Sequence, residues 1–404
     1  MGENINISIG GKWHFYDIVA AAEQLDELNH FYTTVYFKNR RLVDSSCGKK
    51  LHLSNRSCDY FSPDKVIANF VPEILSKALQ KSHIKSEGQA LRMRCALFDD
   101  WTNKVMDSAR IFHSQDGFCL KTAKRMKKEG AIFICDRGII SASYLKRLSE
   151  QEYGKYGIKK EYADCSIMDK THEEHLLADC IIVPTETVRK SLVAEGVDKN
   201  KICIVPYGVD LQLFDGDSDV KITNNKEFKL LFVGEISFRK GCHYLLDAWN
   251  HLKLDNAELI MIGHVEKEFE VFLNQYSGNN YRIISYISQS ELVEYYRTVT
   301  AFILPSLAEG SARVIYEAMA CSLPVIYTDM AGSIARNEID GLEISAFSQE
   351  AIEEAILKLY QDRELGYQMG TNGHEWVKNY SKENYRKRIQ EIYRRYLKKQ
   401  NESV

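Results

Sequence analysis

The sequence predicts an α/β protein in which parallel strands alternate with helices, and three observations support this prediction. Before Pro206, short apolar runs alternate with helical stretches, as in a doubly wound sheet. The later segment 301–328, AFILPSLAEGSARVIYEAMACSLPVIYT, has the pattern of strand, turn, helix and strand, which implies a parallel pair. A length of 404 residues suggests two or three domains.

In the first part of the chain, the expected strands are apolar runs bounded by polar or glycine-containing segments. We expect strands at residues 4–9, 109–112, 131–135 and 180–183, and a helix at 17–28. Gly10 and Gly11 end the first strand without the G-x-G-x-x-G spacing of dinucleotide-binding loops. NAD binding therefore gains little support.

Two polar segments of this part are expected to begin helices. HSQDG at residues 113–117 follows a strand, and Asp116 is a candidate helix cap there. Thr185, within the segment 173–197, is expected to cap another helix. These features concern the fold rather than the chemistry.

The segment 301–328 predicts an anion site at the start of its helix. Strands are expected at 301–304 and 325–327, with a helix from about residue 311 to residue 321. The amides of Gly310, Ser311 and Ala312 should lack intrahelical partners, and the helix dipole favours phosphate there. Glu309 can then reach sugar hydroxyls, and Glu317 can accept two hydrogen bonds from a ribose diol. An ordinary amphipathic helix with an internal Arg–Glu pair is the alternative.

A second cationic segment lies earlier in the chain. Residues 230–233 predict a buried strand, Gly234 permits a close turn, and Arg239 and Lys240 precede a helix that begins near residue 242. Two cations at the carboxyl end of a strand suit a diphosphate. Solvated surface charges are the alternative interpretation.

These segments resemble a known family. The spacing from Glu309 to Glu317 is similar to the E-x7-E motif of retaining glycosyltransferases with the GT-B fold, the group 1 glycosyl transferase family. Four further segments resemble the family in order, at residues 201–214, 228–249, 257–264 and 284–306. The resemblance implies two Rossmann-like domains that face a cleft, with a C-terminal helix crossing back to the first. The implied bounds are 1–205, 206–383 and 384–404.

The resemblance also implies roles for individual residues. Glu309 would lie near the donor sugar, Glu317 would bind the ribose, and Lys240 would hold the diphosphate in place of a metal ion. The family usually has an Arg where this chain has Glu235, and Arg239 is the candidate substitute. Donor contacts are also expected at the following positions: Gly234, Ile287, Gly310, Ser311 and Ala312.

The implied reaction is transfer of a sugar, with retention, from a UDP- or GDP-sugar to a saccharide or glycolipid acceptor in surface polysaccharide or glycoconjugate biosynthesis. No cofactor and no covalent nucleophile are implied. A nucleotide-sugar epimerase of the same fold remains an alternative. An inactive partner subunit is another alternative, because Glu235, the missing His and Ser322 depart from the family pattern.

A catalytic histidine is the main gap in the resemblance. The family often has a His after the strand that ends near Cys135, whereas this chain has Asp136, Arg137 and Ser141 there. His113, from the neighbouring strand, is our candidate replacement, with a packed or capping histidine as the alternative.

On the acceptor side, the resemblance places Gly10, Gly11 and His14 at the mouth of the cleft, together with Lys12 and Trp13. A plain strand-to-helix turn explains the two glycines equally well.

Two motifs give little support for a metal site. His172 and His175 lie three residues apart on an expected helix, but this is not the H-E-x-x-H pattern and no third ligand is evident. The acidic run at residues 215–219 has no strand leading into it and is expected to be a solvated linker.

Composition and charge favour a cytoplasmic enzyme. A net charge of −3 gives no reason to expect nucleic acid as a partner, and no apolar run or leader pattern indicates membrane insertion or secretion. Residues 384–399 predict a helix with cations on one face and the following residues packed on the first domain: Ile389, Ile392, Tyr393 and Tyr396. Peripheral contact with the inner face of the membrane and a homo-oligomer are left open.

Overall fold

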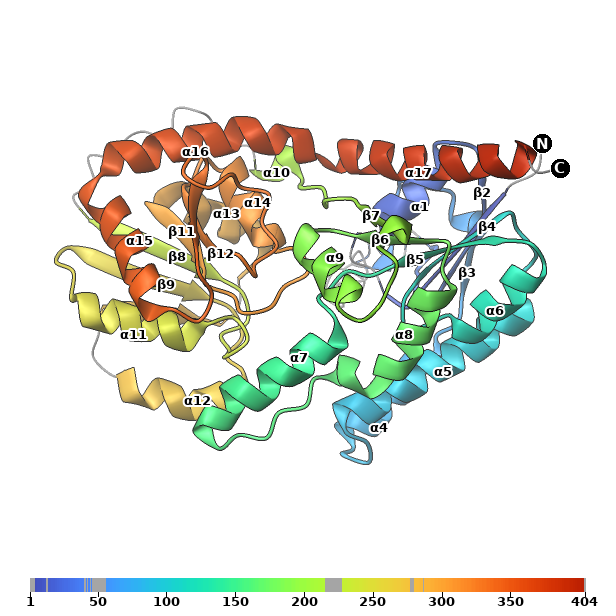
Figure 1. Ribbon diagram of the computed structural model, residues 1–404, viewed down its shortest axis with the longest axis horizontal. Helices are drawn as coiled ribbons and strands as arrows, with labels where there is room; N and C mark the ends of the chain where they lie inside the picture. Colours follow the sequence, from blue (N-terminus) through green and yellow to red (C-terminus); the bar gives the residue numbers. More distant parts are fainter. Residues whose placement is uncertain are drawn as a thin grey trace.

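The protein consists of two α/β domains that lie side by side and are bridged by a long C-terminal helix (Figure 1). The structure is a computed structural model and describes residues 4–11, 14–39, 41, 43, 45, 56–214, 227–276, 280–285 and 287–402. Lys12, Trp13 and the acidic run at 215–219 lie outside the described residues.

The first domain is built on a parallel sheet of seven strands in the order β3-β2-β1-β4-β5-β6-β7. The strands are β1 (Ile5–Ile9), β2 (Leu28–Thr33), β3 (Val66–Ala68), β4 (Ile111–Gln115), β5 (Ile132–Asp136), β6 (Cys180–Val183) and β7 (Ile202–Ile204). The helices are α1 (Phe15–Glu23), α4 (Val71–Lys81), α5 (Glu87–Val105), α6 (Leu120–Lys128), α7 (Ala142–Leu148), α8 (Met168–Leu177) and α9 (Glu186–Val193). Apolar clusters cover both faces of this sheet, as parallel sheets require.

The second domain repeats the same strand order in a parallel sheet of six strands, β10-β9-β8-β11-β12-β13. Its strands are β8 (Phe228–Val233), β9 (Ala257–Ile262), β10 (Tyr281–Ile284), β11 (Ala301–Leu304), β12 (Val325–Thr328) and β13 (Gly341–Ile344). Its helices are α10 (Leu211–Phe214), α11 (Cys242–Leu252), α12 (Lys267–Leu273), α13 (Gln289–Thr298), α14 (Arg313–Ala320), α15 (Gln349–Gln361) and α16 (Arg363–Val377). Two doubly wound domains are therefore confirmed.

The last helix, α17 (Lys382–Glu402), crosses back and packs along α1 of the first domain (Figure 1). Ile389 and Tyr393 are fully buried in the first domain's apolar core, and Ile392 and the partly buried Tyr396 join them. The predicted crossing helix is confirmed. No helix within the described ranges is both long and apolar enough to cross a bilayer.

Some predicted boundaries are wrong for identifiable reasons. The first helix ends at Glu23 rather than at residue 28, because Asp26 adopts a left-handed conformation (φ 56°) and Leu28 already begins β2. The strand predicted at 109–112 is β4, which continues through buried His113 and Ser114.

Asp116 caps no helix, because α6 begins four residues later with Cys119 at its N-cap position. Thr185 does cap α9, as predicted: its hydroxyl accepts from the amide of Val188.

Candidate active site

The donor side of the site begins with an ion cluster around Glu309. The Lys240 Nζ lies 2.5 Å and the Arg239 Nη1 2.9 Å from the Glu309 Oε1, and the Ser306 hydroxyl donates to the same oxygen at 2.8 Å. Arg239 and Lys240 follow β8, whereas Ser306 and Glu309 follow β11. These two strands are neighbours in the sheet, so their carboxyl ends bring the predicted residues together.

This cluster keeps Glu309 ionised. Burial alone would raise the pKa of the Glu309 carboxyl, but Lys240 and Arg239 outweigh burial and lower it. Arg239 is also 3.8 Å from Glu235, so its guanidinium is shared between two carboxylates. Lys240, by contrast, has Glu309 as its one ion-pair partner among the described residues.

The start of α14 lies directly after Glu309. Its N-cap residue, Ala312, offers no side-chain cap, and α14 begins at Arg313, two residues later than predicted. The amides of Gly310 and Ser311 have no hydrogen-bond partner among the described residues. The Ala312 amide, in contrast, donates to the Ala331 carbonyl, which lies outside α14, so it lacks an intrahelical partner as expected but already has a hydrogen bond.

Glu317 lies within α14 in an apolar setting. The Tyr296 hydroxyl donates to its carboxylate at 3.2 Å. Burial raises the pKa of Glu317 to about 7, while Arg313 and the Tyr296 hydroxyl act in the opposite direction. Near neutral pH this carboxyl is therefore divided between its protonated and ionised forms.

The first domain closes tightly against the start of α14. A Cβ on Gly310 would lie only 1.8 Å from the Gly138 carbonyl oxygen, so the two backbones are in direct contact. The Thr185 hydroxyl donates to the Gly310 carbonyl at 2.7 Å. Arg137 holds the opposing loop, because its guanidinium donates to the carbonyls of Ile139 and Ile140.

His14 forms a buried pair with Asp136 on the acceptor side. The His14 Nε2 lies 3.0 Å from the Asp136 Oδ1, and the His14 ring packs on Tyr207 with 4.3 Å between ring centroids. Asp136 ends β5, the position after which the resemblance implies a histidine. Both residues were singled out in the sequence analysis, but no local pattern indicated that their side chains would form a pair.

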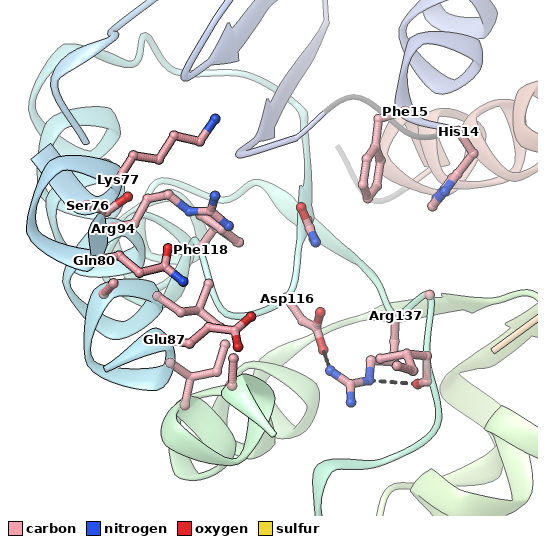
Figure 2. Close-up of a pocket in the computed structure, with 17 residues that line it drawn as sticks. His14, Phe15, Ser76, Lys77, Gln80, Glu87, Arg94, Asp116, Phe118 and Arg137 are labelled. Atoms are coloured by element: carbon pink, nitrogen blue, oxygen red, sulfur yellow. Dashed lines mark hydrogen bonds and ion pairs between the residues drawn. The ribbon is translucent and has the colours of Figure 1, made fainter. Parts of the chain in front are cut away.

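A cavity of about 370 Å³ opens beside this pair (Figure 2). His14 and Gly138 line one part, and side chains of α4 and α5 line another. Gly10 lies directly against Phe118, one of the residues that line the cavity, because a Cβ on Gly10 would lie 2.4 Å from the Phe118 ring. A Cβ on Gly11, in contrast, would have no atom within 4 Å. The acceptor-side glycines therefore differ in role, and Gly10 serves packing.

The expectation for His113 is not supported. Its side chain is fully buried, and its Nδ1 lies 2.7 Å from the hydroxyl of Tyr393 on α17. A side chain without exposed surface cannot contact a sugar in this structure. His113 instead fixes the crossing helix to β4.

The remaining residues predicted from the sequence have the following positions in the structure. Gly234 follows β8 with φ 150°, and a Cβ there would lie 3.6 Å from the Lys240 side chain. Ile287 lies just before α13 and packs against the core of the second domain, which leaves its predicted donor contact untested. His175 pairs with buried Asp116 at 3.0 Å. In the described part of the chain, no group of three or more His, Cys, Asp or Glu side chains is arranged to hold a metal ion.

Comparisons with known proteins agree with this architecture. Residues 215–376 match the family model described as Glycosyl transferases group 1. The capsular polysaccharide biosynthesis glycosyltransferase CapM of Staphylococcus aureus is 27% identical over 329 residues, which cover 75% of this chain and 83% of that protein. The UDP-Gal:alpha-D-GlcNAc-diphosphoundecaprenol alpha-1,3-galactosyltransferase of Escherichia coli is 27% identical over 184 residues, 42% of this chain and 48% of that protein.

The chain spans about half the length of most curated relatives it matches. Among solved structures, sucrose-phosphate synthase from Thermosynechococcus elongatus superposes with a TM-score of 0.66 at 18% identity, over 97% of this chain and 98% of that one. At that identity the likeness concerns the fold. The second domain is therefore similar to the group 1 glycosyl transferases, and the two domains together have the GT-B fold.

Proposed function

We propose that the protein transfers a sugar, with retention of configuration and without a metal ion, from a UDP- or GDP-sugar to a saccharide or glycolipid acceptor. The observation that carries this proposal is the ion cluster of Lys240, Arg239 and Glu309 beside the amides of Gly310 and Ser311, which have no hydrogen-bond partner in the described part of the chain. Cations and amides at one point suit a diphosphate, and the adjacent carboxylate suits sugar hydroxyls.

In the proposed reaction, the bond between the sugar C1 and the diphosphate oxygen breaks, and a bond from C1 to the acceptor oxygen forms on the same face. The Lys240 ammonium and the two amides stabilise the negative charge that develops on the departing diphosphate. The proton of the acceptor hydroxyl passes to the departing phosphate oxygen. Glu309 orients the sugar, and Glu317 accepts hydrogen bonds from the ribose.

The relatives' names support a polysaccharide or glycolipid setting, because one acts in capsular polysaccharide biosynthesis and another on a diphosphoundecaprenol-linked sugar. We extend this setting to the present chain as part of the proposal.

The test is incubation with labelled UDP- and GDP-sugars, with and without saccharide and lipid-linked acceptors, in the presence of EDTA. We expect release of nucleoside diphosphate that the acceptor stimulates, and NMR of the product should show the donor's anomeric configuration. Isomerisation without acceptor would instead identify an epimerase. No turnover of any donor, with intact fold, would favour an inactive partner subunit.

A matched pair of lysine variants makes the test specific to the site. Lys240→Met should lower kcat at least about a hundredfold, as expected when one charge-stabilising donor is removed. Lys378→Met removes an exposed lysine that pairs with Glu375 at the surface and should leave the rate unchanged. Equal rates for the two variants would contradict the role of Lys240.

A further inference from the structure

One segment of the first domain leaves that domain and packs into the second. The segment, which we call the strap, is residues 149–162. It follows α7 as a π-helical turn at Ser149–Tyr153 and continues as a 3₁₀ turn at Gly154–Tyr156. Figure 1 shows α7 and the chain after it extending to α12 of the second domain. The chain then returns to the first domain, where the 3₁₀ turn Ala163–Ile167 packs on α5.

Two tyrosines of the strap enclose one phenylalanine of the second domain. Tyr156 stacks on the Phe238 ring with 4.7 Å between centroids, and Tyr153 meets the same ring edge-on at 5.0 Å. Tyr153 is fully buried and belongs to the apolar core of the second domain, although the chain reaches it from the first. Phe269 and Phe272 of α12 cover other sides of Phe238. Phe238 is therefore held between rings from both domains.

Polar contacts fasten the strap to the second domain at two points. At the first, the Tyr153 hydroxyl donates to the Glu266 carboxylate at 2.7 Å, and the Lys160 Nζ lies 2.8 Å from that carboxylate. At the second, the Glu152 carboxylate lies 3.2 Å from the His243 Nε2. Both carboxylates are buried, and a buried carboxylate that loses its partner is costly. These contacts therefore hold the strap against the second domain.

Phe238 comes immediately before the two cations of the donor side, Arg239 and Lys240. The turn that carries all three residues runs from Gly234 (φ 150°) to Gly241 (φ 68°). Glycine loses more conformational freedom than any other residue when it is fixed, so the backbone of this turn depends on tertiary contacts to stay in one conformation. The buried ring of Phe238 supplies such contacts, and the strap tyrosines are among its neighbours. The strap thus acts on the two cations through Phe238.

We propose that the strap completes the donor site from the first domain, with Tyr153 and Tyr156 as positioning residues that act through Phe238. They fix the turn whose two cations, Arg239 and Lys240, bind the diphosphate. The identity of the ligand rests on the proposed function, whereas the hold of the strap on the turn does not.

The test uses variants of the full chain at Tyr156, because this tyrosine is 41% exposed and its loss leaves the buried Tyr153 in place. Tyr156→Ala removes the stacked ring, and Tyr156→Phe keeps it. Tyr367→Ala is the matched control, since it removes a tyrosine of similar exposure, 37%, on α16. Hydrogen exchange of the peptide 234–242 reports the order of the turn, and calorimetry with UDP and with GDP reports diphosphate binding.

We expect Tyr156→Ala to speed exchange at residues 234–242 at least about tenfold, because the turn then opens more readily, and to leave β8 and β9 unchanged. Affinity for the nucleoside diphosphate should fall about tenfold, the size expected for one aromatic pair. In sugar transfer the donor KM should rise by the same factor while kcat changes less than about twofold, as for lost uniform binding. Tyr156→Phe and Tyr367→Ala should match the unmodified protein.

Unchanged exchange of the turn, or unchanged nucleotide affinity, in Tyr156→Ala would overturn the proposal. An equal loss in Tyr156→Phe would also overturn it, because that variant keeps the ring. Faster exchange throughout the second domain with a lower unfolding temperature would make the strap a general stabilising element, against the proposal. Faster exchange confined to the turn, in a protein that binds neither UDP nor GDP, would support the hold of the strap on the turn and contradict the proposed function.

Discussion

Replacing Gly310 by alanine tests whether the observed closure of the two domains is the working arrangement. The added Cβ would lie 1.8 Å from the Gly138 oxygen and 2.9 Å from the Ile139 Cα. Because a Cβ contact below 3.0 Å is not tolerated, the opposing loop must retreat by at least about 1.2 Å. Neither partner is a flexible side-chain tip, and Arg137 anchors the loop through two carbonyls, so the strain cannot relax locally.

Two effects of different size should follow. Overpacking of this kind costs about 1–3 kcal/mol, so the unfolding temperature should fall by a few degrees. A displacement of about 1 Å at the reacting groups should lower kcat roughly a hundredfold. Gly154→Ala is the matched control, because Gly154 has helical angles (φ −61°, ψ −32°) and no atom lies within 4 Å of a built Cβ.

Initial rates, donor affinity and thermal unfolding of the two variants provide the readouts. If Gly310→Ala transferred sugar at the rate of the unmodified protein and unfolded at the same temperature, the reasoning would be refuted. The contact with Gly138 would then not exist in the active form. A loss of rate in Gly154→Ala as well would show that the assay reports general damage.

Two further predictions concern pH. Burial raises the pKa of Glu317 to about 7 from 4.5, so its contribution to stability is complete below pH 4.5 and is lost as the pH rises through about 7. The ionised form accepts more hydrogen bonds, so donor affinity by calorimetry should rise about tenfold from pH 6 to pH 8, following the ionised fraction, and Glu317→Gln should abolish that slope. Burial lowers the pKa of His113 to about 4 from 6.5, so stability is complete above pH 6.5 and is lost as the pH falls toward 4, by about 3 kcal/mol in total. Urea midpoints for His113→Gln should depend less on pH over that interval, and an unchanged dependence would assign the acid sensitivity to other groups.

The fold was predictable because apolar periodicity and spacing act locally. The strand at 180–183 was predicted with its observed bounds, and the strand–helix–strand segment at 301–328 was predicted nearly as observed. The cluster of Arg239, Lys240 and Glu309 was also predictable, because neighbouring parallel strands bring their carboxyl ends together.

The rest depends on contacts between distant segments. His113 was placed at a strand end because polar residues usually mark one, whereas β4 carries buried His113 and Ser114 through its middle. The amide of Ala312 is occupied by the Ala331 carbonyl, which no local pattern indicates. Likewise, the pairing of His14 with Asp136 joins residues 122 positions apart.

The crossing helix α17 has a consequence for synthesis. The interior of the first domain includes Tyr385, Ile389 and Tyr393, so the nascent domain lacks part of its core until these residues leave the ribosome. Until then, the apolar face of α1 that α17 covers is exposed while the second domain is translated. Domains generally fold as units during synthesis, but the first domain of this protein completes its core only after the second domain has been translated. During that interval its uncovered apolar surface is a binding site for chaperones.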